Sequence, residues 1–368
     1  MKRKILFIIP TLQGGGAEKL LIDILRNIDY AKYDVQLMYF YQNNIYIDQI
    51  PGQVKLIVPF FIKNTLWDVA KRVFLRVTHL QDVQRRRKIR ACADKHYDCI
   101  ISFLEGMSLH FHTFLTDRAN KNITYMHTDI SRYQLSLNRQ SEKEYSQMDA
   151  VAFVSKQAMD SFKRVFPENR SEHIVMPNFI DIDIVKARAS QFPVQRNIPT
   201  IVCVGRIIPV KGFDLLPDIA MLLKKKMPQF IIRIVGTGED EQKLKNKIDS
   251  QNLSEFFSFE GFQRNPYPYI ANASLMLSTS VAEGFSLVIC ESMALGTPVI
   301  SSKTDGAMSM LGAGAGVLVE RTPEAFADAI LSLMSDNSLY ENYVEAGLSK
   351  AFDHDKSIYM PNFYKLIS

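Results

Sequence analysis

The chain has 368 residues, of which 47% are hydrophobic and 23% are charged. That length is too great for one typical domain and suits two. The composition is that of an ordinary globular protein and argues against long disordered segments. The formal net charge of +5 is a mild excess. It is concentrated in a basic run at residues 85–90, which suits a solvated surface, a nucleic acid or an anionic membrane.

Cysteine usage and the N-terminus favour a cytoplasmic protein. The cysteines show neither a CxxC pairing nor histidines at metal-ligand spacing, which fits a reducing compartment: Cys92, Cys99, Cys203 and Cys290. The apolar run at residues 5–9 follows basic residues but is too short for a secretion signal, and Pro10 ends it. We therefore interpret it as a first strand. No apolar stretch approaches the length of a membrane-spanning helix.

Strands alternate with helical stretches through the first half of the chain. The run at residues 5–9 is typical of a strand buried on both faces of a parallel sheet, and a glycine turn and a helical pattern follow it. Further strands are predicted at residues 35–40, 54–58, 99–103, 122–126 and 151–154, the last closing the series. This alternation predicts an α/β lobe with a mostly parallel sheet over residues 1–180.

The pattern restarts after residues 181–199, which we interpret as an irregular linker because Pro193 and Pro199 interrupt it. A second Rossmann-like lobe is predicted over residues 200–350. Its predicted strands are residues 201–204, 230–235, 256–259, 275–278, 298–301 and 316–319. Its main helices are predicted at about residues 215–226, 240–250 and 285–295.

The strongest motif is a loop that runs into a predicted helix. It consists of Glu283, Gly284, Phe285, Ser286 and Leu287, with Glu291 eight residues after Glu283. The first turn of a helix leaves N–H groups unpaired and carries partial positive charge, so this segment is a candidate diphosphate site. Leu287 and Glu291 share a helix face, where a carboxylate can accept hydrogen bonds from ribose hydroxyls. Alternatively, Glu291 faces solvent and Glu283 merely favours the helix start.

A second motif follows the strand predicted at residues 201–204. Gly205 and Arg206 end that strand, and Lys211 and Gly212 lie five residues further on. Ligands of open α/β sheets bind at the carboxyl ends of the strands. The forked guanidinium of Arg206 and the compact ammonium of Lys211 can converge there on phosphate oxygens. In a transferase they would neutralise charge on a leaving diphosphate; the alternative is a pair of solvated cations.

The first lobe offers two weaker candidates. Gly15, Gly16, Ala17 and Glu18 resemble a dinucleotide-binding turn, but the full G-x-G-x-x-G spacing is missing, so a dehydrogenase is poorly supported. This glycine loop can still approach a phosphate or an acceptor, or it is a plain tight turn. His127 lies at the tip of a predicted strand, where it can donate to or accept from a sugar hydroxyl. A lone histidine is more often structural.

Together these motifs resemble the retaining GT-B enzymes of glycosyltransferase family 4, also called the glycosyltransferase group 1 family. The resemblance covers essentially the whole chain and is carried by the glycine loop with Glu18, His127, Pro177-Asn178, Gly205-Arg206 with Lys211-Gly212, and the E-x7-E element from Glu283 to Glu291. It implies a GT-B fold: two facing Rossmann-like lobes, the first binding the acceptor and the second the nucleotide sugar. A C-terminal helix over residues 351–368 would cross back to the first lobe, although Pro361 should break or kink it.

The resemblance also implies a role for each motif. Arg206 and Lys211 would bind the donor diphosphate, and Glu291 would hold the ribose. Glu283 would contact hydroxyls of the transferred sugar, which His127 would contact from the other lobe. The remaining donor-binding residues would border or approach the phosphates: Gly15, Gly16, Gly284, Phe285, Ser286 and Leu287.

Retention in this family is usually drawn as a front-face displacement in which a donor phosphate oxygen takes the acceptor proton. The two glutamates need not then be the acid and nucleophile of a glycosidase. No metal and no cofactor would be required beyond the nucleotide-diphosphate sugar, with UDP favoured, because two cations and a helix start supply the positive charge. Asp181 and Asp183 resemble the manganese-binding aspartates of another glycosyltransferase class, but we expect them to be turn or helix-start residues.

The implied acceptor is a glycan or a lipid-linked sugar in the assembly of bacterial surface polysaccharide or oligosaccharide. A helical stripe precedes the basic run and has aromatic residues beside it: Leu66, Val69, Val73, Val77 and Leu80, with Trp67 and Phe74. A basic amphipathic helix over residues 66–90 suits an anionic membrane surface, here the inner face of the plasma membrane. Alternatively, the stripe packs in the core of the lobe.

Two other functions stay open. A nucleotide-sugar 2-epimerase shares the two-lobed fold but needs no acceptor, and the E-x7-E spacing with Arg206 and Lys211 favours transfer over it. A nucleic-acid binder would need aromatic residues interleaved with its cations. Residues 85–90 contain none, so no nucleic-acid partner is expected.

Overall fold

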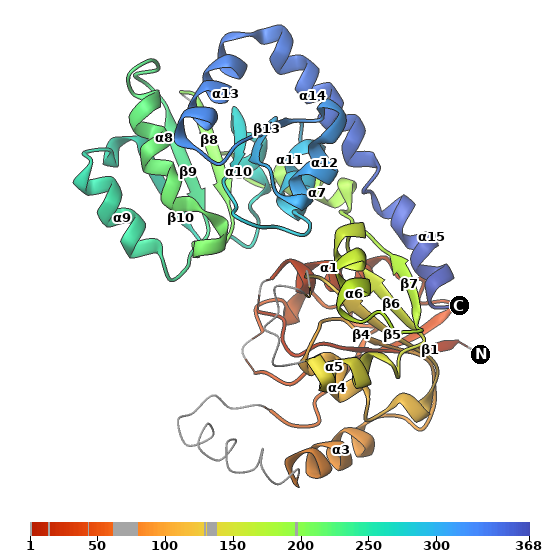
Figure 1. Cartoon of the computed structure of the whole chain (residues 1–368). Helices are drawn as coiled ribbons and strands as arrows, with labels where there is room; N and C mark the ends of the chain where they lie inside the picture. Colours follow the sequence, from red (N-terminus) through yellow and green to blue (C-terminus); the bar gives the residue numbers. More distant parts are fainter. Residues whose placement is uncertain are drawn as a thin grey trace. The chain divides into compact units, whose positions relative to one another are not determined.

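The structure is a computed structural model that describes residues 2–13, 15–42, 44–61, 80–128, 130, 138–195 and 198–368. The chain forms two compact units. Unit 1 comprises Met1–Pro177 together with Tyr359–Ser368, and unit 2 comprises Asn178–Ile358. Each unit contains a parallel sheet with helices packed against it (Figure 1). The prediction of two α/β lobes with parallel sheets is confirmed.

Within its described residues, unit 1 has a seven-stranded sheet. Its spatial order is β3 (Lys55–Ile57), β2 (Tyr33–Met38), β1 (Arg3–Ile8), β4 (Tyr97–Ser102), β5 (Ala119–Met126), β6 (Ala150–Phe153) and β7 (Glu172–Val175). Every neighbouring pair is parallel. The chain builds outward from β1 in one direction and then from β4 in the other. The carboxyl ends of β1 and β4 therefore flank a topological switch point.

Successive side chains along a strand point to opposite faces of this sheet, and both faces are covered. Leu6 and Ile8 point to one face, where helices α3 to α6 complete the core. Phe7 points to the other, where α15 packs against it. The helices of unit 1 are α1 (Gly16–Asn27), α3 (Leu80–Cys92), α4 (Met107–His112), α5 (Asn138–Tyr145), α6 (Lys156–Val165) and α15 (Lys356–Leu366), with short 3-10 turns at Ile47–Gln49 and Thr116–Arg118.

The C-terminal helix α15 is continuous through Pro361, so the expected break does not occur. A proline inside a helix removes one backbone hydrogen bond, but tertiary contacts hold this helix on the sheet of unit 1. The Phe363 ring stacks on Phe7 with centroids 6.3 Å apart. The Tyr359 hydroxyl lies 3.0 Å from the Tyr125 hydroxyl. This burial outweighs the missing bond.

Unit 2 has a six-stranded parallel sheet within its described residues. The order is β10 (Phe257–Gly261), β9 (Ile231–Val235), β8 (Thr200–Val204), β11 (Leu275–Ser278), β12 (Val299–Ser302) and β13 (Val317–Val319). The direction of building reverses between β8 and β11, so the switch point of this unit lies between their carboxyl ends.

Two layers of helices cover this sheet (Figure 1). One face carries α8 (Leu216–Leu223), α9 (Glu241–Ser250) and α13 (Pro323–Ser335). The other carries α7 (Ile182–Ala189), α10 (Tyr267–Ala271), α11 (Leu287–Ala294) and α12 (Asp305–Leu311). Helix α14 (Asn337–Phe352) and 3-10 turns at Pro209–Lys211, Phe213–Leu215, Ser254–Phe256 and Gly312–Gly314 complete the unit.

The stretch predicted to be an irregular linker, residues 181–199, instead begins with helix α7, which belongs to unit 2. Asp181 caps this helix, because its carboxylate accepts from the Ile184 N–H at 3.2 Å. Lys356 pairs with Asp181 at 2.9 Å and with Asp183 at 3.0 Å. The interpretation of the two aspartates as helix-start residues is confirmed.

In the part of the chain that the structure describes, no helix combines the length and the apolar character that crossing a bilayer requires. The hydrophobic stripe at residues 66–80 falls almost entirely outside the described residues.

Candidate functional site

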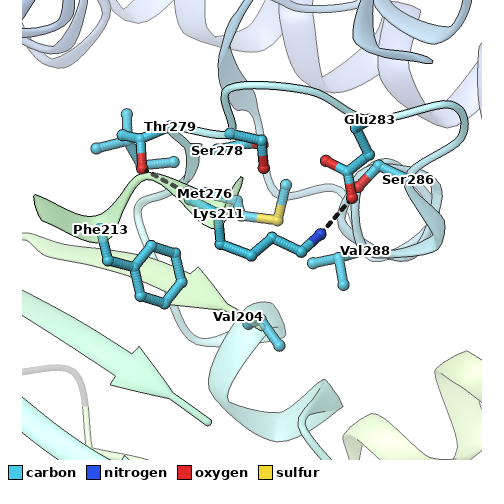
Figure 2. A pocket seen from close by; sticks show the side chains of 11 residues that line it. Val204, Lys211, Phe213, Met276, Ser278, Thr279, Glu283, Ser286 and Val288 are labelled. Carbon is cyan, nitrogen blue, oxygen red and sulfur yellow. Dashed lines mark hydrogen bonds and ion pairs between the residues drawn. The ribbon is translucent and has the colours of Figure 1, made fainter. Parts of the chain in front are cut away.

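A pocket of about 270 Å³, part of it open to solvent, lies at the carboxyl edge of the unit 2 sheet (Figure 2). It sits between the ends of β8 and β11, which is the switch point where open α/β sheets bind their ligands. The residues that line it are Val204, Lys211, Phe213, Met276, Leu277, Ser278, Thr279, Ser280, Glu283, Ser286 and Val288.

Lys211 and Glu283 form an ion pair in this pocket (Figure 2). Lys211 belongs to the loop after β8, and Glu283 belongs to the loop after β11. The two side chains are 25% and 12% exposed, so both charges are partly desolvated and accessible from the pocket. The structure thus brings Lys211 together with the E-x7-E segment.

Backbone contacts set the position of each member of the pair. The Val281 N–H donates to the Val210 carbonyl at 2.9 Å, next to Lys211. The Gly306 N–H, in the first turn of α12, donates to the Glu283 carbonyl at 2.8 Å. The loops that carry the two charges are therefore tied to neighbouring segments of unit 2.

Hydroxyl groups and a helix start supply the rest of the polar lining. Ser278, Thr279, Ser280 and Ser286 all contribute to it. Ser286 is the N-cap of α11, and its side chain makes no capping hydrogen bond. The first turn of a helix carries partial positive charge. An ammonium, a carboxylate and several hydroxyls in one pocket suit a ligand that has both anionic and hydroxyl groups.

Glu291 lies on α11 but is not among the described residues that line the pocket. It is 2% exposed, and the Tyr267 hydroxyl donates to its carboxylate at 3.2 Å. The alternative that it faces solvent is wrong, because α11 is buried between α7, α10, α12 and α14. Phe285, in the loop before α11, packs edge-on against His354 with centroids 5.3 Å apart.

Arg206 follows β8 at the same edge of the sheet as Lys211. Its side chain is exposed, and it is not among the described residues that line the pocket. The strand-end argument placed both cations at the same edge of the sheet, and that placement holds for the backbone. The direction of an exposed side chain depends on its local contacts, which the sequence pattern does not contain.

The glycine loop of unit 1 starts α1. Gly15 is the N-cap and Gly16 the first residue of the helix, with Glu18 in its first turn. A Cβ added to Gly15 would lie 2.2 Å from the Glu18 carboxylate. The loop therefore brings backbone and a carboxylate together at the carboxyl end of β1, beside the switch point of unit 1.

His127 follows β5 at the same edge of unit 1. Burial lowers the pKa of His127 to about 4, so the imidazole is neutral near pH 7. Its Nε2 is buried and has no hydrogen-bond partner within the described part of the chain. The ring packs on Phe103 with centroids 5.2 Å apart. A neutral, unpaired ring nitrogen at a strand tip can bond to a hydroxyl of a ligand.

Glu105, which no sequence motif singled out, holds the turn that carries His127. Its carboxylate accepts from the backbone N–H of His127, from the Thr128 N–H at 2.8 Å and from the Thr128 hydroxyl at 3.1 Å. Burial raises the pKa of the Glu105 carboxyl, although these hydrogen bonds oppose that shift. The only signal in the sequence was an acidic residue just after a predicted strand. Glu105 can reach His127 only because β4 and β5 are neighbours in the sheet.

Most of unit 2 matches a known protein family. Residues 187–350 match the family described as Glycosyl transferases group 1. This range covers most of unit 2, including Lys211, Glu283 and the pocket between them.

Curated relatives are similar over parts of their length. The poly(glycerol-phosphate) alpha-glucosyltransferase of Bacillus subtilis is 28% identical over 247 residues, which cover 64% of this chain and 35% of that protein. The N-acetylgalactosamine-N,N'-diacetylbacillosaminyl-diphospho-undecaprenol 4-alpha-N-acetylgalactosaminyltransferase of Campylobacter jejuni is 27% identical over 215 residues, or 58% of either chain. The matched segments thus span less than two thirds of both relatives.

Solved structures extend the similarity to the whole fold. HepE of Anabaena in complex with UDP and glucose superimposes with a TM-score of 0.76 at 20% identity, covering 99% of both chains. A second structure, described as "Trehalose-6-phosphate from E. coli bound with UDP-2-fluoro glucose", gives a TM-score of 0.76 at 15% identity. The chain therefore has the predicted GT-B fold, and its residues 187–350 are similar to the glycosyl transferases group 1 family.

Proposed function

We propose that this chain is a retaining glycosyltransferase that moves a hexose-type sugar from a UDP-sugar to a glycan or lipid-linked acceptor. The Lys211–Glu283 pair at the switch point of unit 2 is the observation that carries the proposal. Its ammonium suits a diphosphate, and its carboxylate suits sugar hydroxyls. The names of the two curated relatives, one acting on poly(glycerol phosphate) and one on a diphospho-undecaprenol sugar, support the acceptor class and a role in bacterial surface polysaccharide assembly.

Each side of the pocket has its own task in this proposal. Lys211 and the start of α11 neutralise the charge that develops on the leaving diphosphate. Arg206, whose side chain is exposed, binds the diphosphate beside Lys211. Glu283 accepts from hydroxyls of the transferred sugar. Glu291 serves the ribose side of the nucleotide.

Unit 1 carries candidate groups of its own. The neutral imidazole of His127 can bond to a sugar hydroxyl, and Glu105 keeps the His127 turn in place. Gly15 and Gly16 allow the backbone after β1 to approach a phosphate or an acceptor.

The proposed reaction proceeds on one face of the sugar. The bond from the anomeric carbon to the diphosphate oxygen breaks while the acceptor oxygen attacks from the same side, and the acceptor proton passes to a phosphate oxygen of the leaving UDP. The configuration at the anomeric carbon is retained. We propose that no metal takes part, because Lys211, Arg206 and the start of α11 supply positive charge.

A thermal-shift screen against nucleotide sugars tests the donor. A ligand that binds only the native state stabilises it by about 2.7 kcal/mol at 100 times its Kd, so we expect a UDP-sugar and UDP to raise the Tm, with and without EDTA. UMP is the matched control, because it lacks the second phosphate that Lys211 would bind. If no nucleoside diphosphate or its sugar raises the Tm, the proposed function is wrong; if EDTA abolishes the shift, metal independence is wrong.

We also propose that the basic helix α3 rests on an anionic membrane where a lipid-linked acceptor is met. Arg90 pairs with Asp117 at 2.6 Å, whereas the side chains of Arg86, Arg87 and Lys88 are exposed. Juxtamembrane cations contribute about 1 kcal/mol each near an anionic surface.

Sedimentation with vesicles that contain anionic phospholipid tests this membrane contact. Changing Arg86, Arg87 and Lys88 to glutamine should release most of the bound protein. The matched control changes three exposed lysines of unit 2, Lys224–Lys226, and should leave sedimentation unaltered. Equal vesicle binding by the wild-type protein and the α3 variant would contradict the proposed contact between α3 and the membrane.

The epimerase alternative receives no support from the relatives reported above, which are named as transferases. An epimerase would convert the nucleotide sugar without an acceptor. A product analysis of the donor alone distinguishes the two, because transfer requires a second substrate.

A further inference from the structure

Arg321 ties together the two loops that form the pocket of unit 2. It follows β13, and its Nε–H donates to the Thr279 carbonyl at 3.0 Å. Its terminal nitrogen pairs with the Asp214 carboxylate at 3.0 Å and lies 3.5 Å from the Gly212 carbonyl. Thr279 belongs to the loop after β11, whereas Gly212 and Asp214 belong to the loop after β8. One guanidinium therefore bonds to both loops.

The loop after β8 is packed tightly against this guanidinium. Gly212 has a φ of 68°, in the left-handed region that glycine adopts without strain. A Cβ added to it would lie 2.2 Å from the Thr279 carbonyl oxygen and 2.7 Å from Arg321. The Thr279 hydroxyl also donates to the Lys211 carbonyl at 3.2 Å. The residue that follows Lys211 is thus fixed between two partners.

We propose that Arg321 is a positioning residue that holds Lys211 ready for the diphosphate of the donor. This inference rests on the proposed function for the identity of the ligand. Arg321 is not among the described residues that line the pocket, so it acts through the backbone beside Lys211. A planar guanidinium donates in two fixed directions, here to a carbonyl and a carboxylate, which an ammonium does not reproduce.

The benefit of such a clamp is preorganisation. Lys211 has a long side chain, and an unrestrained loop would add backbone freedom that ligand binding must remove. The Arg321–Asp214 pair itself is 32% and 65% exposed, and ion pairs of that exposure contribute little to stability. Loss of the clamp should therefore weaken anion binding far more than it lowers the Tm.

Calorimetric titration with UDP tests this inference through a double-mutant cycle. Arg321→Ala should weaken UDP binding on the order of tenfold relative to wild type, because small misplacements of a charged group have effects of that size or larger. Arg321→Lys should bind as weakly as Arg321→Ala. In a Lys211→Ala background, Arg321→Ala should have no further effect, since residues that act through one another are not additive.

Lys303→Ala is the matched control. Lys303 follows β12 and pairs with Glu320 at 2.6 Å, at the same edge of the sheet but outside the described pocket lining. Its loss should leave UDP binding unaltered. An equal loss of affinity from Arg321→Ala with and without Lys211 would overturn the positioning role, and so would unchanged affinity in the single variant.

Hydrogen exchange separates failure of the clamp from failure of the proposed function. In Arg321→Ala, the backbone amides of residues 210–215 should exchange faster than in Lys303→Ala, whatever the ligand is. If the wild-type protein binds no nucleoside diphosphate, the proposed function fails, and the inference that Lys211 is held for such a ligand fails with it. If amide exchange at residues 210–215 does not change, the clamp itself is wrong.

Discussion

Replacing Lys211 with alanine should lower kcat/KM by about 10²- to 10³-fold while the protein stays folded. That range is the usual effect of removing one group that stabilises developing negative charge in a transition state. Lys211 is 25% exposed and its ion-pair partner Glu283 is 12% exposed, so the ammonium acts in a partly desolvated pocket. Turnover is measured as UDP release from the donor that raises the Tm, and folding is checked by the Tm without ligand.

Two further variants serve as controls for the Lys211→Ala result. Lys211→Met keeps most of the aliphatic stem and should lose activity equally, which separates charge from packing. Lys303→Ala removes a lysine that also follows a strand of the same sheet and pairs with a carboxylate, and its turnover should stay within about twofold of wild type, as for most surface changes. Unchanged kcat/KM in both Lys211 variants would contradict the assigned role.

The buried strands were predictable because both of their faces are covered. Residues 275–278 form a continuous apolar run that ends in serine, and β11 has those bounds. The edge strand β7 was missed: its residues Glu172–Val175 are exposed to half-buried, so no continuous apolar run marks it. The hydrophobic pattern marks a strand where apolar residues run together, and β7 begins with two polar residues, Glu172 and His173.

Two predicted interruptions at prolines are wrong because tertiary packing offsets the local cost of proline. Prolines near residues 193 and 199 suggested an irregular linker, yet α7 forms before them, with Asp181 as its cap. Pro361 suggested a break, yet α15 continues because its buried rings pack on unit 1. A proline makes a helix locally less favourable. Only the packed structure shows whether tertiary contacts contribute more than that local cost.

The candidate site was predictable in its backbone and less so in its side chains. The rule that ligands meet strand ends placed Lys211 and Glu283 at one edge, and their ion pair is there. The same rule could not orient the exposed Arg206. Glu105 and Arg321 were beyond sequence reasoning, because each acts on a segment that only the strand order brings beside it.

Gly238→Ala should destabilise unit 2 by about 2–3 kcal/mol, a typical cost of overpacking. Gly238 lies in the turn after β9, and a Cβ there would lie 2.1 Å from the Ile207 carbonyl oxygen and 2.6 Å from the Ile207 nitrogen. Backbone atoms cannot rotate away as a flexible side chain can. The Ile207 segment is also fixed by its N–H bond to the Thr237 carbonyl at 3.0 Å. Urea unfolding followed by circular dichroism measures the loss.

Gly312→Ala is the control, since nothing lies within 4 Å of a Cβ at that position and its φ is −53°. Its stability should match wild type within about 0.5 kcal/mol. Because the Ile207 segment leads into the loop that carries Lys211, Gly238→Ala should also weaken UDP binding below its own unfolding transition, and Gly312→Ala should not. Gly238→Ala could also prove as stable as Gly312→Ala. The turn after β9 and the Ile207 segment after β8 would then not be in the close backbone contact that helps to place Lys211 in the pocket.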